Sequence, residues 1–222
     1  LLAALLGSQL NISSGLAVRY RGRVAYDGTN FQGFQIQLKS DRRTVQGVLE
    51  GVLSQRLQQP IRVVGASRTD AGVHARGQAV HFDVDGEIDL VEVQDSVERM
   101  LPPDVAFWNL QRAPDAKIKQ LKTRERFFPW NVIYDSSRKL YSYRLSLARV
   151  MDPMERFQRW HPDLVHRYLG TMEQREKFAR LLKFFEGTHD FRPFASGVDR
   201  LETMGPEGSL INTTRTVYSV SL

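Results

Sequence analysis

The order of apolar segments in the first half of the chain constrains its fold most strongly. Alternating and β-branched runs predict strands, and apolar residues repeated at helical spacing predict helices. The elements are predicted at 16–26 (strand), 44–59 (helix), from 61 (strand), from 78 (strand), 89–100 (helix) and 105–110 (strand). This β-α-β-β-α-β order is that of the split, ferredoxin-like arrangement. We therefore predict an α+β fold with helices on one face of an antiparallel sheet and the other face free.

The segment from Gly65 to Gln78 is a polar connection between two of these predicted strands. It reads Gly-Ala-Ser-Arg-Thr-Asp-Ala-Gly-Val-His-Ala-Arg-Gly-Gln. A positive charge such as Arg68 keeps a partly buried carboxylate such as Asp70 ionised, as a nucleophile must be. Residues two positions apart face the same side of an extended segment, so both side chains can point into one cleft. The alternative is a solvated surface ion pair, which contributes little to stability.

This stretch resembles the catalytic loop of the pseudouridine synthases that act on the anticodon arm of tRNA (the TruA family). The family pattern is Gly-Arg-Thr-Asp-Ala-Gly-Val-His-Ala, and only its first residue differs here, where Ser67 stands. The resemblance implies that Asp70 is the nucleophile and Arg68 its charge partner. It also implies isomerisation of uridine to pseudouridine in the anticodon stem-loop, on a base flipped out of the stacked helix.

Two further segments are similar to the same family. The block Tyr26–Gln37 matches a loop that lines the RNA cleft, which makes Gln35 a candidate RNA-binding residue. The alternating segment Ser137–Leu145 is a predicted strand and resembles a basic-x-Tyr-x-Tyr strand. The resemblance implies that Tyr141 stacks on the target uracil and that Lys139 contacts RNA. A tyrosine in such a strand can equally be a core residue.

Residues 112–126 interrupt the predicted order of strands and helices and are rich in Lys and Arg. One interpretation is an exposed linker or a solvated helix. The other is a surface that contacts phosphates, because basic side chains supply most of the sequence-independent affinity for nucleic acids. The candidate RNA-binding residues outside the family-like blocks are Lys117, Lys119, Lys122 and, at the end of the Gly65–Gln78 segment, Arg76.

The second half contains another predicted helix, from a capping box at Thr171–Gln174 to Phe185. Its expected buried stripe consists of Phe178, Leu181, Leu182 and Phe185. A tight aromatic turn at 187–194 and a strand at 214–220 follow, and both are similar to family segments. Family members continue with another strand and a helix that carries a Met-Val-Arg motif, so the resemblance implies a second half that is incomplete at its C-terminus.

The resemblance implies two ferredoxin-like halves with the catalytic cleft between them. We divide the chain into a leader at 1–15 without an assignment, a first half at 16–111, a basic insertion at 112–126 and a second half at 127–222. The rival interpretation is an RNA-binding module of the same fold without catalysis. Family members form homodimers, so a homodimer is expected for the full-length protein.

Composition agrees with a polyanionic partner, for which tRNA is the expected molecule. The net charge is +6, and the chain has no cysteine, which excludes disulfides and favours an intracellular location, either cytoplasm or an organelle. No apolar run approaches the length of a membrane span. The five histidines show no metal-motif spacing, so no metal is expected, and His74 is expected to hydrogen-bond the loop. The isomerisation adds no water and moves no electrons, so no cofactor is expected.

Overall fold

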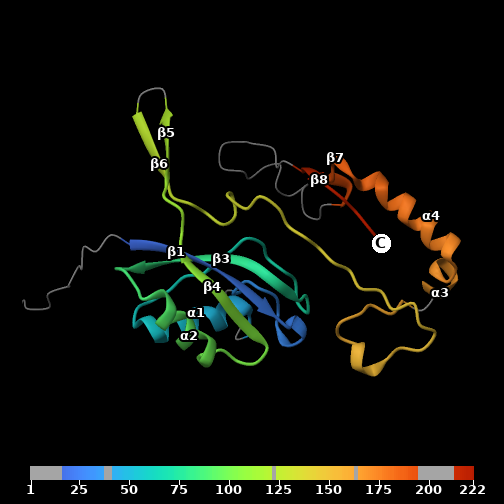
Figure 1. The fold of residues 1–222 in the computed structure, drawn as a ribbon, viewed down its shortest axis with the longest axis horizontal. Coiled ribbons are helices and arrows are strands. Elements are labelled where there is room, and N and C mark those ends of the chain that lie inside the picture. The colour runs from blue at the N-terminus through green and yellow to red at the C-terminus, as the bar shows by residue number, and fades with distance from the viewer. Residues whose placement is uncertain (1–16, 38–41, 122–123, 163–164, 195–212) are drawn as a thin grey trace, which may run out of the picture. The chain divides into compact units, whose positions relative to one another are not determined.

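The computed structural model describes residues 17–37, 42–121, 124–162, 165–194 and 213–222 (Figure 1). The described residues up to Leu140 form one compact unit, and those from Tyr141 onward form a second. The division after Leu140 lies beyond the boundary at 126 that the sequence suggests.

The first unit is built on a four-stranded antiparallel sheet with two helices on one face (Figure 1). Its elements are β1 (Ala17–Tyr26), α1 (Val45–Leu57), β2 (Val64–Gly65), β3 (Ala75–Asp85), α2 (Leu90–Met100) and β4 (Val105–Arg112). The strands lie in the order β2-β3-β1-β4. The elements therefore follow one another along the chain in the order that the sequence predicts.

The central strand β1 separates the two faces of this sheet. It pairs with β3 on one side, where Tyr20 lies opposite Phe82, and with β4 on the other, where Val24 lies opposite Phe107. Because side chains alternate along a strand, one face of β1 supplies buried residues to the core, and the opposite face carries arginines. The fully buried side chains of the core include Tyr20, Phe31, Phe82, Phe107, Leu49, Leu53, Val24, Val45, Val63, Val80, Val84 and Val97.

Both helices of the first unit begin next to the predicted starts at 44 and 89, where a side chain caps each of them. The hydroxyl of Thr44 accepts a hydrogen bond from the Gly47 N–H at 3.2 Å. The carboxylate of Asp89 accepts from the N–H groups of Val91 and Glu92 at 3.0 and 2.9 Å. Each cap satisfies backbone donors that the first helical turn leaves without a partner.

The strand predicted from Ile61 begins later, at Val64, so that part of the prediction is wrong. Ile61 and Val63 are buried, but side chains of α1 take their backbone N–H groups. The Ile61 N–H donates to the hydroxyl of Ser54 and the Val63 N–H donates to the carboxylate of Glu50, both at 2.9 Å. These donors are therefore not available to a strand ladder.

The basic segment forms a β-hairpin, so its interpretation as a linker or a solvated helix is wrong. Strands β5 (Lys117–Leu121) and β6 (Arg124–Phe128) pair antiparallel, with Lys117 opposite Phe128 and Leu121 opposite Arg124. The hairpin projects from the sheet of the first unit (Figure 1). Each of the two strands finds its hydrogen-bonding partner in the other, within the same short segment, and this pairing makes the segment a hairpin.

The second unit contains two helices and a strand pair. Its elements are α3 (Val165–Leu169), α4 (Met172–Leu182), β7 (Gly187–Asp190) and β8 (Thr214–Val217). The predicted capping box at the start of α4 is confirmed. The Gln174 N–H donates to the Thr171 hydroxyl at 3.2 Å, and the Thr171 N–H donates to the Gln174 side chain at 3.1 Å. A β-α-β-β-α-β order is not seen among the described residues of this unit.

The predicted strand Ser137–Leu145 is not a strand in the structure. Among the described residues, its regular pairing is limited to one bridge between Leu145 and Trp160. Alternation assigns side chains to faces, but a strand also needs a neighbour that accepts and donates its backbone hydrogen bonds. Tyr141 is 66% exposed, so the interpretation of this side chain as a core residue is also wrong.

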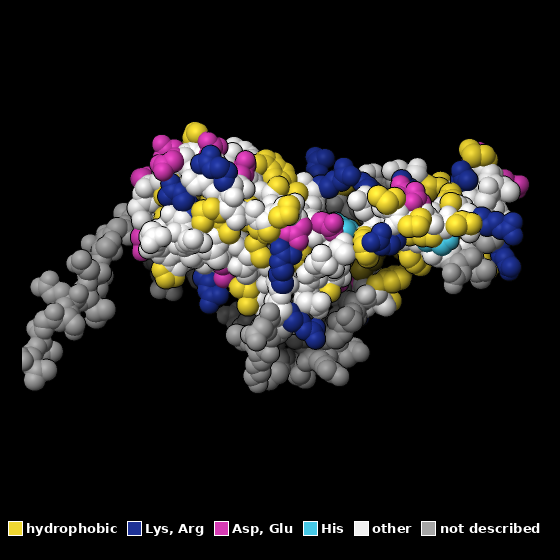
Figure 2. Space-filling view, turned by 90° about the horizontal axis from the view of Figure 1, so that it is seen from below, with side chains coloured by type: hydrophobic (Ala, Val, Ile, Leu, Met, Phe, Trp, Pro, Cys, Tyr) yellow, Lys and Arg dark blue, Asp and Glu magenta, His cyan; other side chains and the backbone are white. Residues whose placement is uncertain are grey.

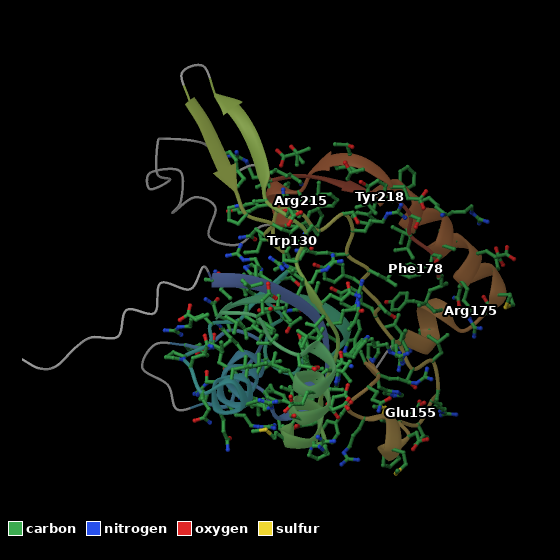
Figure 3. The ribbon with its side chains drawn as sticks, turned by 60° about the vertical axis from the view of Figure 1, so that its left-hand side comes forward. Trp130, Glu155, Arg175, Phe178, Arg215 and Tyr218 are labelled. Carbon is green, nitrogen blue, oxygen red and sulfur yellow. The ribbon has the colours of Figure 1, made fainter. Side chains whose placement is uncertain are left out.

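The predicted buried stripe of α4 is only partly buried. Phe178 and Leu182 are half-buried, whereas Leu181 and Phe185 are exposed. Phe178 projects from α4 in Figure 3, and Figure 2 shows hydrophobic side chains at the surface over the part of the chain that carries α3 and α4. The segment 187–194 is a short strand and a 3-10 turn, and the ring of Phe194 lies 6.4 Å from that of Phe185, which precedes the segment.

Candidate active site

The candidate catalytic residues lie on the loop 66–74, which connects β2 to β3. Exposure alternates along its first half: Ser67 and Thr69 are partly buried, whereas Arg68 and Asp70 are exposed. This alternation agrees with the expectation that Arg68 and Asp70 face the same side of the loop. The loop therefore presents one carboxylate and one guanidinium to solvent.

Arg68 and Asp70 are not paired in this structure. Among the residues that the structure describes, no ion pair joins the two side chains. The Asp70 carboxylate is exposed, not partly buried as the sequence suggests, so water solvates it.

Side chains from two strands hold the loop from the sheet side. The hydroxyl of Tyr26, at the end of β1, lies 2.7 Å from the hydroxyl of Thr69 and donates to the side-chain oxygen of Gln78 at 3.2 Å. The amide nitrogen of Gln78, on β3, donates to the carbonyl of Ser67 at 2.8 Å. The residues on either side of Arg68 are thus both anchored.

Backbone contacts with residues 28–34 hold the loop from a second side. The Phe34 N–H donates to the Thr69 carbonyl at 3.0 Å, and the Gly72 N–H donates to the Phe31 carbonyl at 3.2 Å. A Cβ atom at Gly28 would lie 2.0 Å from the Val73 carbonyl oxygen, so only glycine allows this approach. The early loop similar to the family's RNA-cleft loop is therefore packed directly on the candidate catalytic loop.

His74 is expected to hydrogen-bond the loop, but the partners that the structure shows lie in the turn after β1. Its Nδ1 accepts from the Gly28 N–H at 3.2 Å and lies 3.0 Å from a carboxylate oxygen of Asp27. The hydroxyl and N–H of Thr29 both donate to that same oxygen, and they hold the pKa of Asp27 below its usual range. His74 thereby fixes the end of the loop to the turn that follows β1.

Three other candidate residues are exposed near this loop. Gln35 follows Phe34 on the early loop, and Arg76 stands near the start of β3. The ammonium group of Lys139 donates to the carbonyl of Ala66 at 2.8 Å. Lys139 therefore contacts the first residue of the loop, in addition to the RNA contact that the sequence suggests for it.

The remaining candidates belong to β5 or to the second unit, or lie outside the described residues. Lys117, at the start of β5, forms an ion pair with Asp135. Lys119 belongs to β5, and Lys122 lies outside the residues that the structure describes. Tyr141 is the first residue of the second unit. Its stacking on a uracil stays a prediction.

Sequence reasoning did not identify Tyr26 and Gln78 as the residues that anchor the loop. Their nearness follows from the register of β1 and β3, in which Tyr26 lies opposite Ala75 and Val24 lies opposite Gln78. The signal in the sequence is that Tyr26 ends one predicted strand and Gln78 begins another. The register that brings the two residues together is visible only in the structure.

The described part of the chain contains no group of three or more His, Cys, Asp or Glu residues that could hold a metal ion. None of its helices is long and apolar enough to cross a membrane.

Residues 23–119, which contain the loop and most of the sheet, match a family model described as tRNA pseudouridine synthase. The match is to a class of isomerases. The tRNA pseudouridine synthase A of Leuconostoc citreum is 36% identical over 210 residues, which cover 92% of this chain and 70% of that protein. The enzyme of the same name from Pseudothermotoga lettingae is 35% identical over 203 residues, 91% of this chain and 70% of that protein. The chain belongs to the tRNA pseudouridine synthase A family.

Proposed function

We propose that this protein converts uridine to pseudouridine in the anticodon stem-loop of tRNA, with Asp70 as the nucleophile. The observation that carries the proposal is the placement of Asp70. Its carboxylate is exposed on a loop whose neighbouring residues are anchored from two sides by β1, β3 and the early loop. A nucleophile needs this combination of access and fixed position.

The chemistry requires a carboxylate that can reach the sugar of a flipped uridine. The bond between the ribose and the ring nitrogen breaks, and a bond between the ribose and a ring carbon forms. The proton of that carbon moves to the ring nitrogen, so substrate and product are isomers. A carboxylate that attacks the substrate holds it covalently while the base turns, and it is released when the new bond forms.

Arg68 acts on the carboxylate in the RNA-bound state. Both side chains are exposed on the loop, and catalytic hydrogen bonds often tighten only when substrate binds. Exclusion of water by the RNA strengthens the attraction between guanidinium and carboxylate. Arg68 thus keeps Asp70 ionised at the moment when solvent no longer does.

The remaining candidates bind or order the RNA. Tyr141 stacks on the flipped base, since an exposed aromatic ring offers a face to any base. Gln35 and Arg76 contact the RNA near the loop, and the net charge of +6 favours the phosphate backbone. The protein works as a homodimer, and light scattering of the full natural chain that shows only monomer at micromolar concentration would contradict this.

The test is the single-turnover rate at saturating tRNA, measured with the full natural chain. Asp70→Asn, which keeps the size of the side chain but removes its charge, is expected to lower the rate by about 1,000-fold or more. Asp95→Asn, an exposed aspartate on α2, is the matched control and should retain the wild-type rate. An Asp70→Asn protein that isomerises uridine normally would overturn the proposal. A wild-type protein that binds tRNA without isomerising it would establish the rival binding function.

A further inference from the structure

Tyr26 is a buried tyrosine whose hydroxyl meets the candidate catalytic loop. Its side chain is 4% exposed, and its ring packs against Phe31 and Phe34, with centroids 6.4 Å away in both cases. The hydroxyl contacts Thr69 and Gln78. Burial raises the pKa of Tyr26, so the phenol keeps its proton and can donate it in a hydrogen bond.

The hydrogen bonds at Tyr26 have a defined direction. Because Tyr26 donates its single proton to the side-chain oxygen of Gln78, it must accept from the hydroxyl of Thr69. Gln78 then donates its amide proton to the carbonyl of Ser67. The chain of hydrogen bonds runs from Thr69 through Tyr26 and Gln78 back to Ser67, so it closes on the loop and brackets Arg68.

We propose that Tyr26 is a positioning residue for the reaction, which it serves by fixing Thr69 and thereby the carboxylate of the next residue, Asp70. The inference rests on the proposed function of Asp70. Small displacements of a reacting group lower a rate strongly, because the bound geometry must be close to that of attack. Binding of tRNA is spread over many phosphate contacts and does not depend on this geometry.

The strand β1 offers a matched control for a tyrosine-to-phenylalanine change. Tyr20 is 1% exposed, donates its hydroxyl proton to Glu87 at 3.0 Å and accepts from the Ile88 N–H at 3.2 Å. Like Tyr26, it is a buried tyrosine with two hydrogen bonds on the same strand. Its partners belong to the segment before α2 and not to the candidate catalytic loop.

The experiment compares Tyr26→Phe with Tyr20→Phe in the full natural chain, by single-turnover rate at saturating tRNA and by a tRNA binding titration. We expect Tyr26→Phe to lower the saturated rate by about 10- to 100-fold with a change in Kd of less than about twofold. Tyr20→Phe should change neither by more than about twofold. A Tyr26→Phe protein with the wild-type rate, or an equal loss of rate in both variants, would overturn the inference.

A second pair of variants keeps the test decisive if Tyr26→Phe does not fold. Thr69→Ser keeps the hydroxyl that donates to Tyr26, and Thr69→Val removes it with little change in shape. We expect a higher saturated rate for Thr69→Ser than for Thr69→Val at equal tRNA affinity, and equal rates would contradict the role. An active Asp70→Asn protein would refute the proposed function itself, whereas an inactive one beside an unaffected Tyr26→Phe protein refutes only the role of Tyr26.

Discussion

His81 is a buried histidine on β3 whose neutral form is built into the first unit. Its side chain is 3% exposed, and its Nδ1 accepts a hydrogen bond from the Val132 N–H at 3.3 Å. The indole of Trp130 (Figure 3) packs edge-on against its ring, with centroids 6.0 Å apart. Burial, together with the positive charge of Arg19, lowers the pKa of His81 to about 4.

This lowered pKa predicts a loss of stability in mild acid. In the unfolded chain His81 has its ordinary pKa of 6.5, whereas in the folded chain its pKa is about 4. The unfolded state is therefore favoured as the pH falls through 6.5, and the contribution of neutral His81 is complete only above that pH. Urea unfolding should show a free energy of unfolding lower by about 2 kcal/mol at pH 5 than at pH 7.

The control for this prediction is His81→Asn, which keeps an acceptor for the Val132 N–H but does not titrate in this range. The variant is less stable at both pH values, so the comparison is the difference between them. An equal difference in the wild type and in His81→Asn would show that other groups cause the pH dependence.

The sequence displays the motif that carries the candidate residues, but it does not display the partners that hold them. The motif around Asp70 and the capping role of Thr44 depend on neighbours a few positions away, which a sequence displays directly. The anchoring of the loop by Tyr26 and Gln78 depends on the register between β1 and β3. The unpaired state of Arg68 depends on how the loop faces solvent, which no local pattern encodes.

The helices and strands of the chain show the same limit at the next scale. Helices α1, α2 and α4 begin where local capping residues predict, because their hydrogen bonds are internal. The segment 137–145 has a good strand pattern without a strand, since a ladder needs a second segment. The basic hairpin shows the converse case. Its two strands supply each other's hydrogen bonds, so they form a ladder although the sequence did not indicate one.

Substitution by alanine is expected to have opposite effects on the free energy of unfolding at two glycines on different elements. A Cβ atom at Gly22, on β1, would lie 2.5 Å from the ring of Phe107, whereas one at Gly51, on α1, would have no neighbour within 4 Å. Gly22→Ala should lower the free energy of unfolding by about 1–3 kcal/mol through overpacking. Gly51→Ala should raise it by about 0.5–1 kcal/mol, because alanine is the better helix former.

Urea unfolding of the two variants beside the wild type measures both effects. The substitution is identical, so a difference in sign reports only the surroundings of each glycine. Tolerance of Gly22→Ala would contradict the packing that places Phe107 against β1, and destabilisation by Gly51→Ala would contradict the open space at that position.

At the scale of the whole molecule, the net charge of +6 favours binding to RNA. The basic hairpin projects from the first unit and carries part of this charge. Neutralising Lys117, Lys119 and Lys122 together to glutamine should weaken tRNA binding and flatten its dependence on salt, because fewer counterions are released. The saturated single-turnover rate should stay near that of the wild type. Binding titrations at several salt concentrations measure the first effect.

The matched control removes the same number of charges from α1, α2 and the segment that follows α1. Arg56, Arg62 and Arg99 serve this purpose, and the first two form ion pairs with Glu92 and Glu50. Their replacement by glutamine should leave the slope of affinity against salt close to the wild-type value. An equal fall in affinity for both triple variants would mean that net charge, and not the hairpin, governs tRNA binding.

The glycine-mediated contact between residues 28–34 and the loop 66–74 also determines when the loop can order during folding. Its backbone hydrogen bonds, such as that from Gly72 to Phe31, join segments about forty positions apart in the sequence. The loop therefore belongs to the cooperative unit of the sheet, although it lies at the surface. The Gly72 amide should exchange its hydrogen with solvent together with that of Phe34, at the opening free energy of the sheet and not at that of a frayed connection.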